Sequence, residues 1–307
     1  MGHDGLALRH AGTLIVVNGP TASGKSRVAA SIARHFGSEV INADSRQFYH
    51  ALRIGAALPT EKEMNGVRHH FIGHLDVHDQ MSAGAFARAA MPVIDVLFER
   101  HGRAVMTGGS GLYIEAVCRG FDPLPTGDRT VREQLQKRYQ QEGLSVLVEE
   151  LKQLDPDHWR TIDRRNPHRV IRALEVCKIT GKPFSAQRTG RELRKDLNAM
   201  HIALDLSRED LHARIEDRVD AMFAAGLLEE ARALLPYREL NALRTVGYRE
   251  LFDHFDGKFE LDQCKLLIKQ NTRRYAKRQL TWLRRDGACH WMPPDENAII
   301  QFLHEHP

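Results

Sequence analysis

The stretch NGPTASGKSR, residues 18–27, holds two glycines, a lysine and a serine at the spacing G-x-x-x-x-G-K-[ST]. Gly19 and Gly24 allow successive backbone N–H groups to converge on one anion, because neither residue has a side chain that would fill the turn. Lys25 can neutralise the terminal phosphate oxygens, and the Ser26 hydroxyl can hold a Mg²⁺ ion that bridges them. The pattern predicts a phosphate site, but ATP, GTP and other pyrophosphate compounds all fit it.

The segments on either side of this loop are those that would aim it at an anion. Residues 13–18 are an apolar run typical of a buried strand, and residues 25–36 have the spacing of a helix. A helix that begins at the loop turns the positive end of its dipole toward the phosphates. The residues predicted to bind the diphosphate or nucleotide are Gly19, Pro20, Thr21, Ala22, Ser23, Gly24, Lys25 and Ser26.

The first hundred residues predict an α/β fold. Strands are expected at 38–44 and 103–109 and a helix at 83–101, which with short connections indicates a parallel sheet. Ligands of such sheets bind beyond the carboxyl ends of the strands. Three polar residues fall at such ends, and we expect them to meet one substrate: Asp44, Thr107 and Ser110.

A strand of apolar residues that ends in a Mg²⁺-binding Asp is usual in nucleoside triphosphate hydrolases. Neither VINAD (40–44) nor AVMTGG (104–109) supplies it cleanly. Its absence favours a loop that captures a leaving group over one that hydrolyses ATP.

In two later regions, residues 129–195 and residues 265–285, Lys and Arg outnumber Asp and Glu. A Pro/Gly-rich break at 122–128 precedes a helical region that extends to about residue 195, and a further strand is expected at 201–206. The predicted domains are therefore a core of residues 11–122 and 200–307 and a helical insertion of residues 123–199. Residues 265–285 hold no acid, and Lys269, Arg273 and Lys277 form a stripe at i, i+4 spacing. This stripe predicts contact with a phosphate backbone, the alternative being a solvated helix face.

Composition sets broad limits. The chain has 307 residues, 42% of them hydrophobic, and a formal net charge of +4, which permits a nucleic-acid partner without requiring one. It has no apolar run of membrane-spanning length, and its first twelve residues lack the apolar middle of a signal peptide. We expect a cytoplasmic monomer with no membrane partner.

Together with the phosphate loop, DSRQFYHALRIG (44–55) and GGSGLYIEA (108–116) resemble the tRNA dimethylallyltransferases, also called tRNA isopentenyltransferases. Further blocks in the order of that family lie at 166–185, 213–231, 243–258 and 269–286. The resemblance covers roughly residues 13–292. It implies a P-loop NTPase-like core, with a parallel sheet flanked by helices, and an inserted all-helical subdomain that binds tRNA.

The activity implied by the resemblance is transfer of a dimethylallyl group from dimethylallyl diphosphate to the exocyclic amine of adenosine 37. This adenosine lies just 3′ of the anticodon, in tRNAs that read codons beginning with U. The implied partners are the tRNA anticodon stem-loop and dimethylallyl diphosphate, and the implied cofactor is Mg²⁺. The adenine cannot be reached while it is stacked in the loop, so we expect it to be flipped out.

Residue roles follow from the same resemblance. Asp44 matches the general base of the family, and Arg218 matches an arginine that reaches the diphosphate. Ser110 stands where the family usually has Thr and keeps the catalytic hydroxyl. The positions that map onto tRNA contacts are Asp44, Ser45, Arg46, Gln47, Ser110, Arg132, His168, Arg169, Val170, Ile171, Arg172, Arg244, Thr245, Val246, Gly247, Tyr248 and Arg249. The chain departs from the family at Leu58, which replaces a lysine, and after Pro183.

Three other functions remain open from the residues alone. A small-molecule P-loop kinase would use the same loop for ATP but leaves the basic regions without a role. A non-catalytic RNA-binding protein explains the basic regions but not the phosphate loop beside a carboxylate. Prenyl transfer to a free adenine nucleotide shares the core but does not need a basic helical insertion.

Overall fold

The computed structural model describes residues 12–306, apart from 121, 123, 126, 189–196 and 286. The chain folds as two compact units, and each is described by itself. Unit 1 comprises Met1–Cys118 and Lys195–Pro307, and unit 2 comprises Arg119–Arg194. The domain boundaries expected from the sequence, after residues 122 and 199, lie a few residues further along the chain.

Unit 1 is built on a sheet whose described strands all pair in parallel. The strand order is β3-β2-β4-β1-β5-β6. The strands are β1 (Gly12–Asn18), β2 (Val40–Asn42), β3 (His69–His70), β4 (Arg103–Thr107), β5 (Leu197–Leu204) and β6 (Cys289–Met292). The parallel α/β core predicted from the sequence is confirmed, whereas the short strands β3 and β6 were not predicted.

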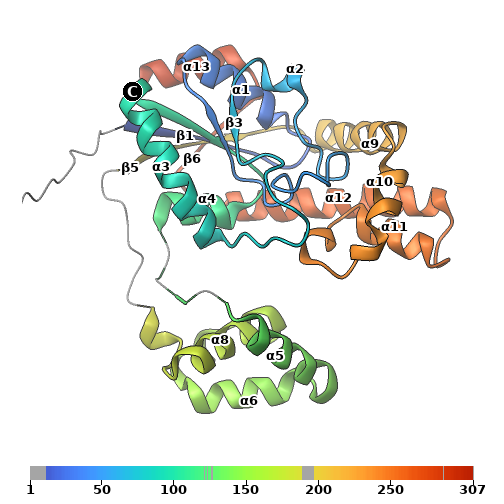
Figure 1. The fold of residues 1–307 in the computed structure, drawn as a ribbon. Coiled ribbons are helices and arrows are strands. Elements are labelled where there is room, and N and C mark those ends of the chain that lie inside the picture. Colours follow the sequence, from blue (N-terminus) through green and yellow to red (C-terminus); the bar gives the residue numbers. More distant parts are fainter. Residues whose placement is uncertain are drawn as a thin grey trace, which may run out of the picture. The chain divides into compact units, whose positions relative to one another are not determined.

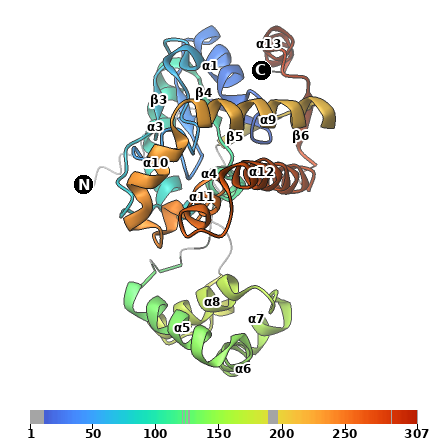
Figure 2. The same ribbon diagram turned by 90° about the vertical axis from the view of Figure 1, so that its right-hand side faces the viewer.

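Helices cover both faces of this sheet (Figures 1 and 2). On one face, Ile15 and Val17 of β1 and Val105 of β4 share a hydrophobic cluster with α1 (Lys25–His35) and α13 (Glu296–Glu305). On β1 this face is formed by Ile15 and Val17, which are two residues apart, as the pleat of a strand requires. Helix α3 (Ala83–His101) packs so closely on β1 that a Cβ on Gly12 would lie 2.4 Å from the Phe98 ring.

The remaining helices of unit 1 lie in the segments that connect consecutive strands. They are α2 (Glu61–Met64), α4 (Gly111–Arg119), α9 (Arg208–Ala224), α10 (Leu227–Leu234), α11 (Tyr248–Phe255) and α12 (Leu261–Leu283). Short 3₁₀ turns lie at Leu235–Tyr237 and Asn241–Leu243. None of the described helices is both long and apolar enough to cross a membrane.

Helices α9 and α12 pack against each other beside the phosphate loop. Their contact is formed by Leu211 and Ile215 of α9 and Ala276 of α12, and Ala22 of the loop packs on the same cluster. The loop is therefore supported by α1, which directly follows it, and by two helices that begin only at residues 208 and 261.

All the secondary-structure elements described in unit 2 are helices, as expected. Its elements are α5 (Arg129–Glu142), α6 (Leu144–Leu154), α7 (Pro156–Thr161), α8 (Pro167–Thr180) and a 3₁₀ turn at Ser185–Gln187. Helix α8 begins where the Asn166 side chain accepts a hydrogen bond from the Arg169 N–H, and it ends at Gly181, whose φ of 66° suits glycine. Leu135, Leu147 and Leu174 bring α5, α6 and α8 into one core.

Candidate active site

The phosphate loop leaves β1 at Asn18 and enters α1 at Lys25. Gly24 has a φ of 86° and Ala22 a φ of 65°, so the backbone makes two left-handed steps within three residues. A Cβ on Gly19 would lie 2.6 Å from the Ser23 Oγ, too close for any residue with a side chain. The loop thus has the tight turn that the sequence motif requires.

Ser23 lies inside this turn with an unused hydroxyl. Its side chain is fully buried, and its Oγ has no hydrogen-bond partner among the described residues. A buried hydroxyl without a partner costs free energy, so such a group points to a missing acceptor. A phosphate oxygen seated in the loop would supply that acceptor.

Lys25 is the charged residue of the loop. Its Nζ lies 3.5 Å from the Pro20 carbonyl oxygen, a weak contact for an ammonium group. Burial lowers the pKa of Lys25 from 10.5 to about 8, the negative charge of Asp44 raises it, and the positive charge of Arg218 lowers it. Three charged groups predicted from the sequence to act on one substrate are thus close enough to influence each other.

Arg218 reaches this site from α9. Burial lowers the pKa of its guanidinium, and the charges of Asp44 and Glu63 oppose that shift. A second arginine of α9, Arg214, donates from Nη1 to the Ser23 carbonyl oxygen over 3.5 Å. Helix α9 therefore contributes positive charge beside the phosphate loop.

Asp44 is held at the end of β2 by contacts with the segment that follows β4. The Ala43 N–H donates to the Thr107 carbonyl oxygen over 2.7 Å, which extends the pairing of the two strands. A Cβ on Gly108 would lie 2.3 Å from the Ala43 carbonyl carbon, so only glycine allows the two segments to approach. The Asp44 Oδ1 accepts a hydrogen bond from the Arg46 N–H over 3.0 Å, which orients the carboxylate.

Ser110 joins these segments through its hydroxyl. The Oγ accepts a hydrogen bond from the Ser45 N–H and donates to the Ser45 Oγ, both over 3.0 Å. The predicted convergence of residues 44–46 with residue 110 is thus present. In this structure the hydroxyl of Ser110 acts on the backbone that carries Asp44.

Gln279 of α12 is a site residue that the sequence did not reveal. Its Oε1 accepts a hydrogen bond from the Thr21 N–H over 2.8 Å, and its Nε2 donates to the Gly109 carbonyl oxygen over 3.0 Å. The Tyr275 hydroxyl donates to the same carbonyl over 3.3 Å, and burial, together with the Asp44 charge, raises the pKa of that phenol. Gln279 therefore ties the phosphate loop to the segment beside the carboxylate.

Two of the tRNA contacts predicted in unit 1, Gln47 and Tyr248, have side chains that are buried in this structure. The Gln47 side chain donates to the carbonyl oxygens of Ala56 and Ala57. Tyr248 is fully buried, and its hydroxyl donates to Glu230, which also accepts from the Gly55 N–H. The two side chains instead fix the loop around residues 54–57, where Tyr248 packs on Gly55.

We expect Tyr248→Phe to lower stability by about 1.5–3 kcal/mol, because the substitution removes a buried hydrogen bond to a carboxylate. The affinity for tRNA should stay within about twofold of the wild type. Thermal unfolding and tRNA titration measure the two effects. A large loss of affinity with unchanged stability would restore Tyr248 as a contact residue.

Apart from Gly247, the other predicted tRNA residues of unit 1 are exposed or half-buried. Arg46 is half-buried and donates from Nη1 to the Asn241 carbonyl oxygen over 2.7 Å. Arg244 and Arg249 are exposed, Thr245 and Val246 are half-buried, and Gly247 is buried with a φ of 97°. The arginines of this segment can reach a partner, whereas Gly247 serves the turn before α11.

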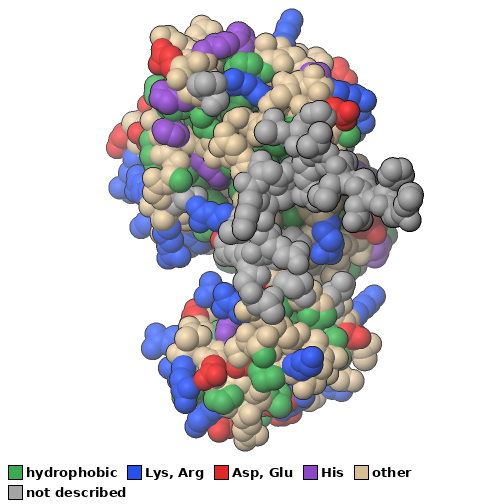
Figure 3. Space-filling view, turned by 90° about the vertical axis from the view of Figure 1, so that its left-hand side faces the viewer, with side chains coloured by type: hydrophobic (Ala, Val, Ile, Leu, Met, Phe, Trp, Pro, Cys, Tyr) green, Lys and Arg blue, Asp and Glu red, His purple; other side chains and the backbone are tan. Residues whose placement is uncertain are grey.

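In unit 2 the predicted contacts divide in the same way. Val170 and Ile171 belong to the helical core and are at most 6% exposed, so the burial of their side chains does not support the predicted contact with tRNA, which stays a prediction. His168 and Arg169 are exposed on the first turn of α8. On the face drawn in Figure 3, Lys and Arg side chains of both units lie at the surface, interspersed with Asp and Glu.

Side chains of the basic stripe of α12 form salt bridges that the sequence of this helix does not indicate. The Lys269 Nζ lies 2.8 Å from the Asp220 Oδ2, and the Arg273 Nη1 lies 2.9 Å from the Glu216 Oε1. Both acids belong to α9. Two of the three stripe residues therefore have intramolecular partners, and the predicted contact with a phosphate backbone loses most of its support.

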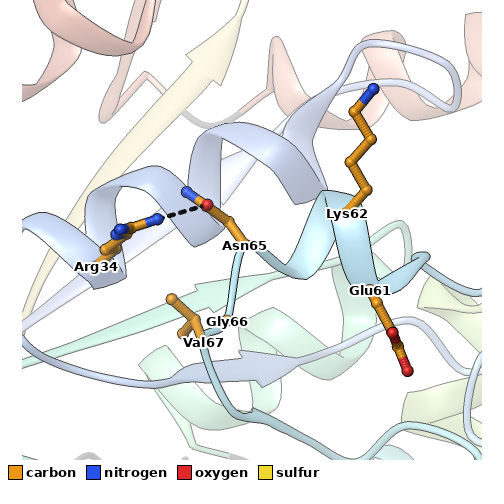
Figure 4. Close-up of a pocket in the computed structure, with 6 residues that line it drawn as sticks. All are labelled: Arg34, Glu61, Lys62, Asn65, Gly66 and Val67. Atoms are coloured by element: carbon orange, nitrogen blue, oxygen red, sulfur yellow. Dashed lines mark hydrogen bonds between the residues drawn. The ribbon is translucent and has the colours of Figure 1, made fainter.

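A pocket on the surface of unit 1 lies away from these residues (Figure 4). It is lined by Arg34 of α1 and by α2 and the segment that follows it. The Arg34 Nη1 donates to the Asn65 Oδ1 over 2.7 Å, while the Glu61 and Lys62 side chains point away from this pair. Arg34 is nine residues along α1 from Lys25, about 13 Å by helical rise, so this pocket is separate from the phosphate loop.

A parallel sheet whose first strand leads through a glycine-rich turn into a helix defines a P-loop protein. The IPP transferase family model matches residues 47–286, and the chain belongs to this family.

Curated relatives and solved structures agree with this membership. The chain is 47% identical to the tRNA dimethylallyltransferase of Christiangramia forsetii, with 93% of this chain and 94% of the relative covered. It is 43% identical to tRNA dimethylallyltransferase 1 of Phocaeicola vulgatus, with 95% and 98% covered. The full-length tRNA isopentenylpyrophosphate transferase of Bacillus halodurans has a TM-score of 0.69 at 34% identity, with 96% of this chain and 95% of that chain covered. A eukaryotic dimethylallyltransferase, solved in work on its action on tRNA, has a TM-score of 0.78 at 25% identity, with 94% and 75% covered.

Proposed function

We propose that this protein is a tRNA dimethylallyltransferase. It transfers the dimethylallyl group of dimethylallyl diphosphate to the exocyclic amine of adenosine 37, in tRNAs that read codons beginning with U, and releases diphosphate. The observation that carries the proposal is geometric: Gln279 joins the phosphate loop at Thr21 to the Gly109 backbone, which lies against the Asp44 carboxylate, so a base and a diphosphate site adjoin in a chain of this family.

The amine of adenine is a weak nucleophile because its lone pair is delocalised into the ring. In the proposed reaction the nitrogen forms a bond to the first carbon of the dimethylallyl group, and the bond from that carbon to the diphosphate oxygen breaks. Asp44 takes the proton that the amine loses, which requires its carboxylate within about 3 Å of the nitrogen. The Arg46 N–H and the Ser45–Ser110 contacts hold the carboxylate in place.

The departing diphosphate gains negative charge as the bond breaks. The loop amides, the Lys25 ammonium, the Arg218 guanidinium and the Ser23 hydroxyl would meet that charge, and fixed positive groups of this kind usually make the largest contribution to such catalysis. The Thr21 N–H already donates to Gln279, so it is held back from the phosphates.

A Mg²⁺ ion fits the Ser26 position. Mg²⁺ in phosphate sites keeps several waters and takes few protein ligands besides the substrate oxygens. Ser26 is the second residue of α1, beside the loop, and no described residue hydrogen-bonds to its hydroxyl. Ser26 would hold the ion, which would supply charge neutralisation at the diphosphate.

We place the protein in the cytoplasm as a monomer that binds the tRNA anticodon stem-loop. Unit 2 and the exposed arginines near residue 244 are the proposed RNA contacts, and their positive charge suits a phosphate backbone. The reactive adenine must leave its stack to reach Asp44.

Incubation with labelled dimethylallyl diphosphate distinguishes this proposal from the alternatives. Label should enter tRNA and not AMP. Label in AMP alone would identify a transferase for free nucleotides. Consumption of ATP with transfer to a small metabolite, and no use of the allylic diphosphate, would identify a kinase. Tight tRNA binding with no turnover would leave an RNA-binding protein.

We expect kcat/KM for dimethylallyl diphosphate to fall as the pH rises through about 8, because the Lys25 ammonium loses its proton there in the free enzyme. Lys25→Arg keeps the positive charge at every accessible pH and should remove this fall. Steady-state rates from pH 6.5 to 9.5 at saturating tRNA measure both profiles. The same fall in Lys25→Arg would assign it to another group.

A further inference from the structure

We propose that Arg132 and Arg172 of unit 2 form one preorganised site for a phosphate of the RNA backbone, and that Glu175 is the positioning residue of this site. The inference rests on the proposed function, since it names how unit 2 grips tRNA. Its new content is that the two arginines act as a pair and that a buried acid, rather than a further base, controls the affinity.

Both arginines donate to the same atom. The Arg132 Nη2 and the Arg172 Nη1 each lie 2.7 Å from the Glu175 Oε2. The Arg172 Nη2 also donates to the Pro125 carbonyl oxygen over 2.7 Å. Arg132 comes from α5 and Arg172 from α8, so one carboxylate oxygen joins the two helices and fixes the relative position of two guanidinium groups.

Burial differs sharply across the group. The Glu175 side chain is 0% exposed, whereas the side chains of Arg132 and Arg172 are 40% and 31% exposed. The acid is therefore beneath the surface and the two cations are at it. Two positive groups and one negative group leave a net charge of +1, presented to solvent by guanidinium N–H groups that the carboxylate does not use.

The second oxygen of the carboxylate has no hydrogen-bond partner within the part of the chain that the structure describes. Glu175 Oε1 is buried and accepts no hydrogen bond from any described residue. Breaking or leaving incomplete a buried charged network costs free energy, so an acid placed only for stability would be expected to have both oxygens satisfied. The unsatisfied oxygen therefore indicates that the main role of the Glu175 carboxylate is to fix the positions of Arg132 and Arg172.

Gly127 gives the arrangement its space. A Cβ on this residue would lie 2.9 Å from the Glu175 Oε1 and 3.0 Å from the Arg132 Nη2. A side chain here would push the acid and Arg132 out of place without altering any charge. The glycine therefore provides a second way to test the geometry.

A phosphodiester is the ligand that this group suits. Guanidinium groups bind phosphate oxygens through paired N–H donors, and two of them at a fixed separation select a tetrahedral anion over a diffuse negative surface. The exposed His168 and Arg169 follow on the first turn of α8, where the helix dipole is positive. Successive backbone phosphates could then be bound along this end of the helix.

The decisive experiment is Glu175→Gln, because positioning and bulk charge predict opposite results. The substitution raises the local net charge from +1 to +2. If charge alone governs binding, tRNA should bind more tightly and with a steeper salt dependence. If Glu175 positions the arginines, the neutral amide oxygen accepts from the two guanidinium groups much more weakly than the carboxylate does, so their relative position loosens. We then expect an affinity loss of about tenfold and a log–log salt slope shallower by about 0.7–0.9, the value of one phosphate contact.

Glu150→Gln is the matched control. Glu150 also joins two cations of unit 2, Arg138 and Lys178, but neither is a predicted tRNA contact. Its affinity and slope should equal those of the wild type, and the KM for dimethylallyl diphosphate should be unchanged in both variants. An equal loss in both variants, an unchanged Glu175→Gln, or tighter binding would each overturn the proposal.

Gly127→Ala covers the case in which Glu175→Gln unfolds unit 2, as detected by circular dichroism. This variant keeps all charges and should still weaken binding of an anticodon stem-loop RNA several-fold, whereas unchanged binding would overturn the proposal. Direct titration with the RNA separates this inference from the proposed function. A wild-type protein that binds RNA but never prenylates it would refute the function and leave the phosphate site to be judged by these variants.

Discussion

Replacement of Asp44 by Asn is expected to lower kcat for prenyl transfer by about 10²–10⁴-fold, while tRNA affinity stays within about threefold. The amide cannot take the proton of the adenine amine, but it has the same shape as the carboxylate. Its oxygen can still accept the hydrogen bond that the Arg46 N–H gives to Oδ1. Single-turnover rates and tRNA titration measure the two effects separately.

Asp205→Asn is the control for this substitution. Asp205 directly follows β5 as Asp44 follows β2 at a short interval, so both lie at the carboxyl edge of the sheet. Asp205 is exposed, however, and its charge does not contribute to the pKa shift of Lys25 or of Arg218. It should react at the wild-type rate. Equal loss of turnover and tRNA binding in Asp44→Asn would show that Asp44 is structural and would remove the proposed base.

The sequence predicted the core of this site because the relevant signals are local. The glycine spacing, the apolar run before it and the helical spacing after it lie within about 25 residues, and the structure has β1 and α1 at these positions. Asp44 and Ser110 were predicted to converge because parallel strands end at the same edge of a sheet. Their link through Ser45 follows from that rule.

Features that depend on packing between distant helices could not be predicted. Gln279 is one uncharged residue in a basic helix, and nothing in its neighbours indicates that it binds Thr21, which is 258 residues away. The salt bridges of Lys269 and Arg273 likewise form only because α9 lies beside α12. The sequence of residues 265–285 contains no acid, so it could not show that acids of another helix neutralise these two side chains. Contacts of this kind depend on how two helices pack, which the sequence of one helix does not reveal.

Burial within a single helix was, by contrast, open to prediction. Val170, Ile171 and Leu174 lie at i, i+1 and i+4, the spacing of an apolar helix face, and all three are in the core of unit 2. A family segment carried over as a block of contacts therefore mixes exposed residues with core residues. Helical periodicity would have separated His168 and Arg169 from Val170 and Ile171.

Lys25→Met is expected to lower kcat/KM for dimethylallyl diphosphate by about 10²–10³-fold, because it removes a buried positive charge from the departing diphosphate. The same substitution should raise the stability of the ligand-free protein. Burial lowers the pKa of Lys25 to about 8, against 10.5 for an exposed lysine. At pH 7 the side chain is therefore protonated in both states, but the protonated form is less favourable in the folded protein than in the unfolded chain.

The pH dependence of stability follows from these two values. Below about pH 8 the lysine is protonated in both states, and the cost of its burial is fully present. Between about 8 and 10.5 the unfolded chain binds more protons than the folded protein, so the stability of the wild type should rise with pH in this interval. Lys25→Met lacks this contribution, and at pH 7 it should be more stable by on the order of 1–3 kcal/mol.

Thermal unfolding at pH 7 and pH 9.5 without substrate tests this reasoning. The variant should unfold at a higher temperature than the wild type at pH 7, and the difference should shrink at pH 9.5. Addition of diphosphate should reverse the order, because only the wild type binds it strongly. A variant that is less stable than the wild type at pH 7 would mean that favourable contacts hold Lys25 in the loop without ligand. Burial of the Lys25 ammonium would then carry no free-energy cost that diphosphate binding relieves.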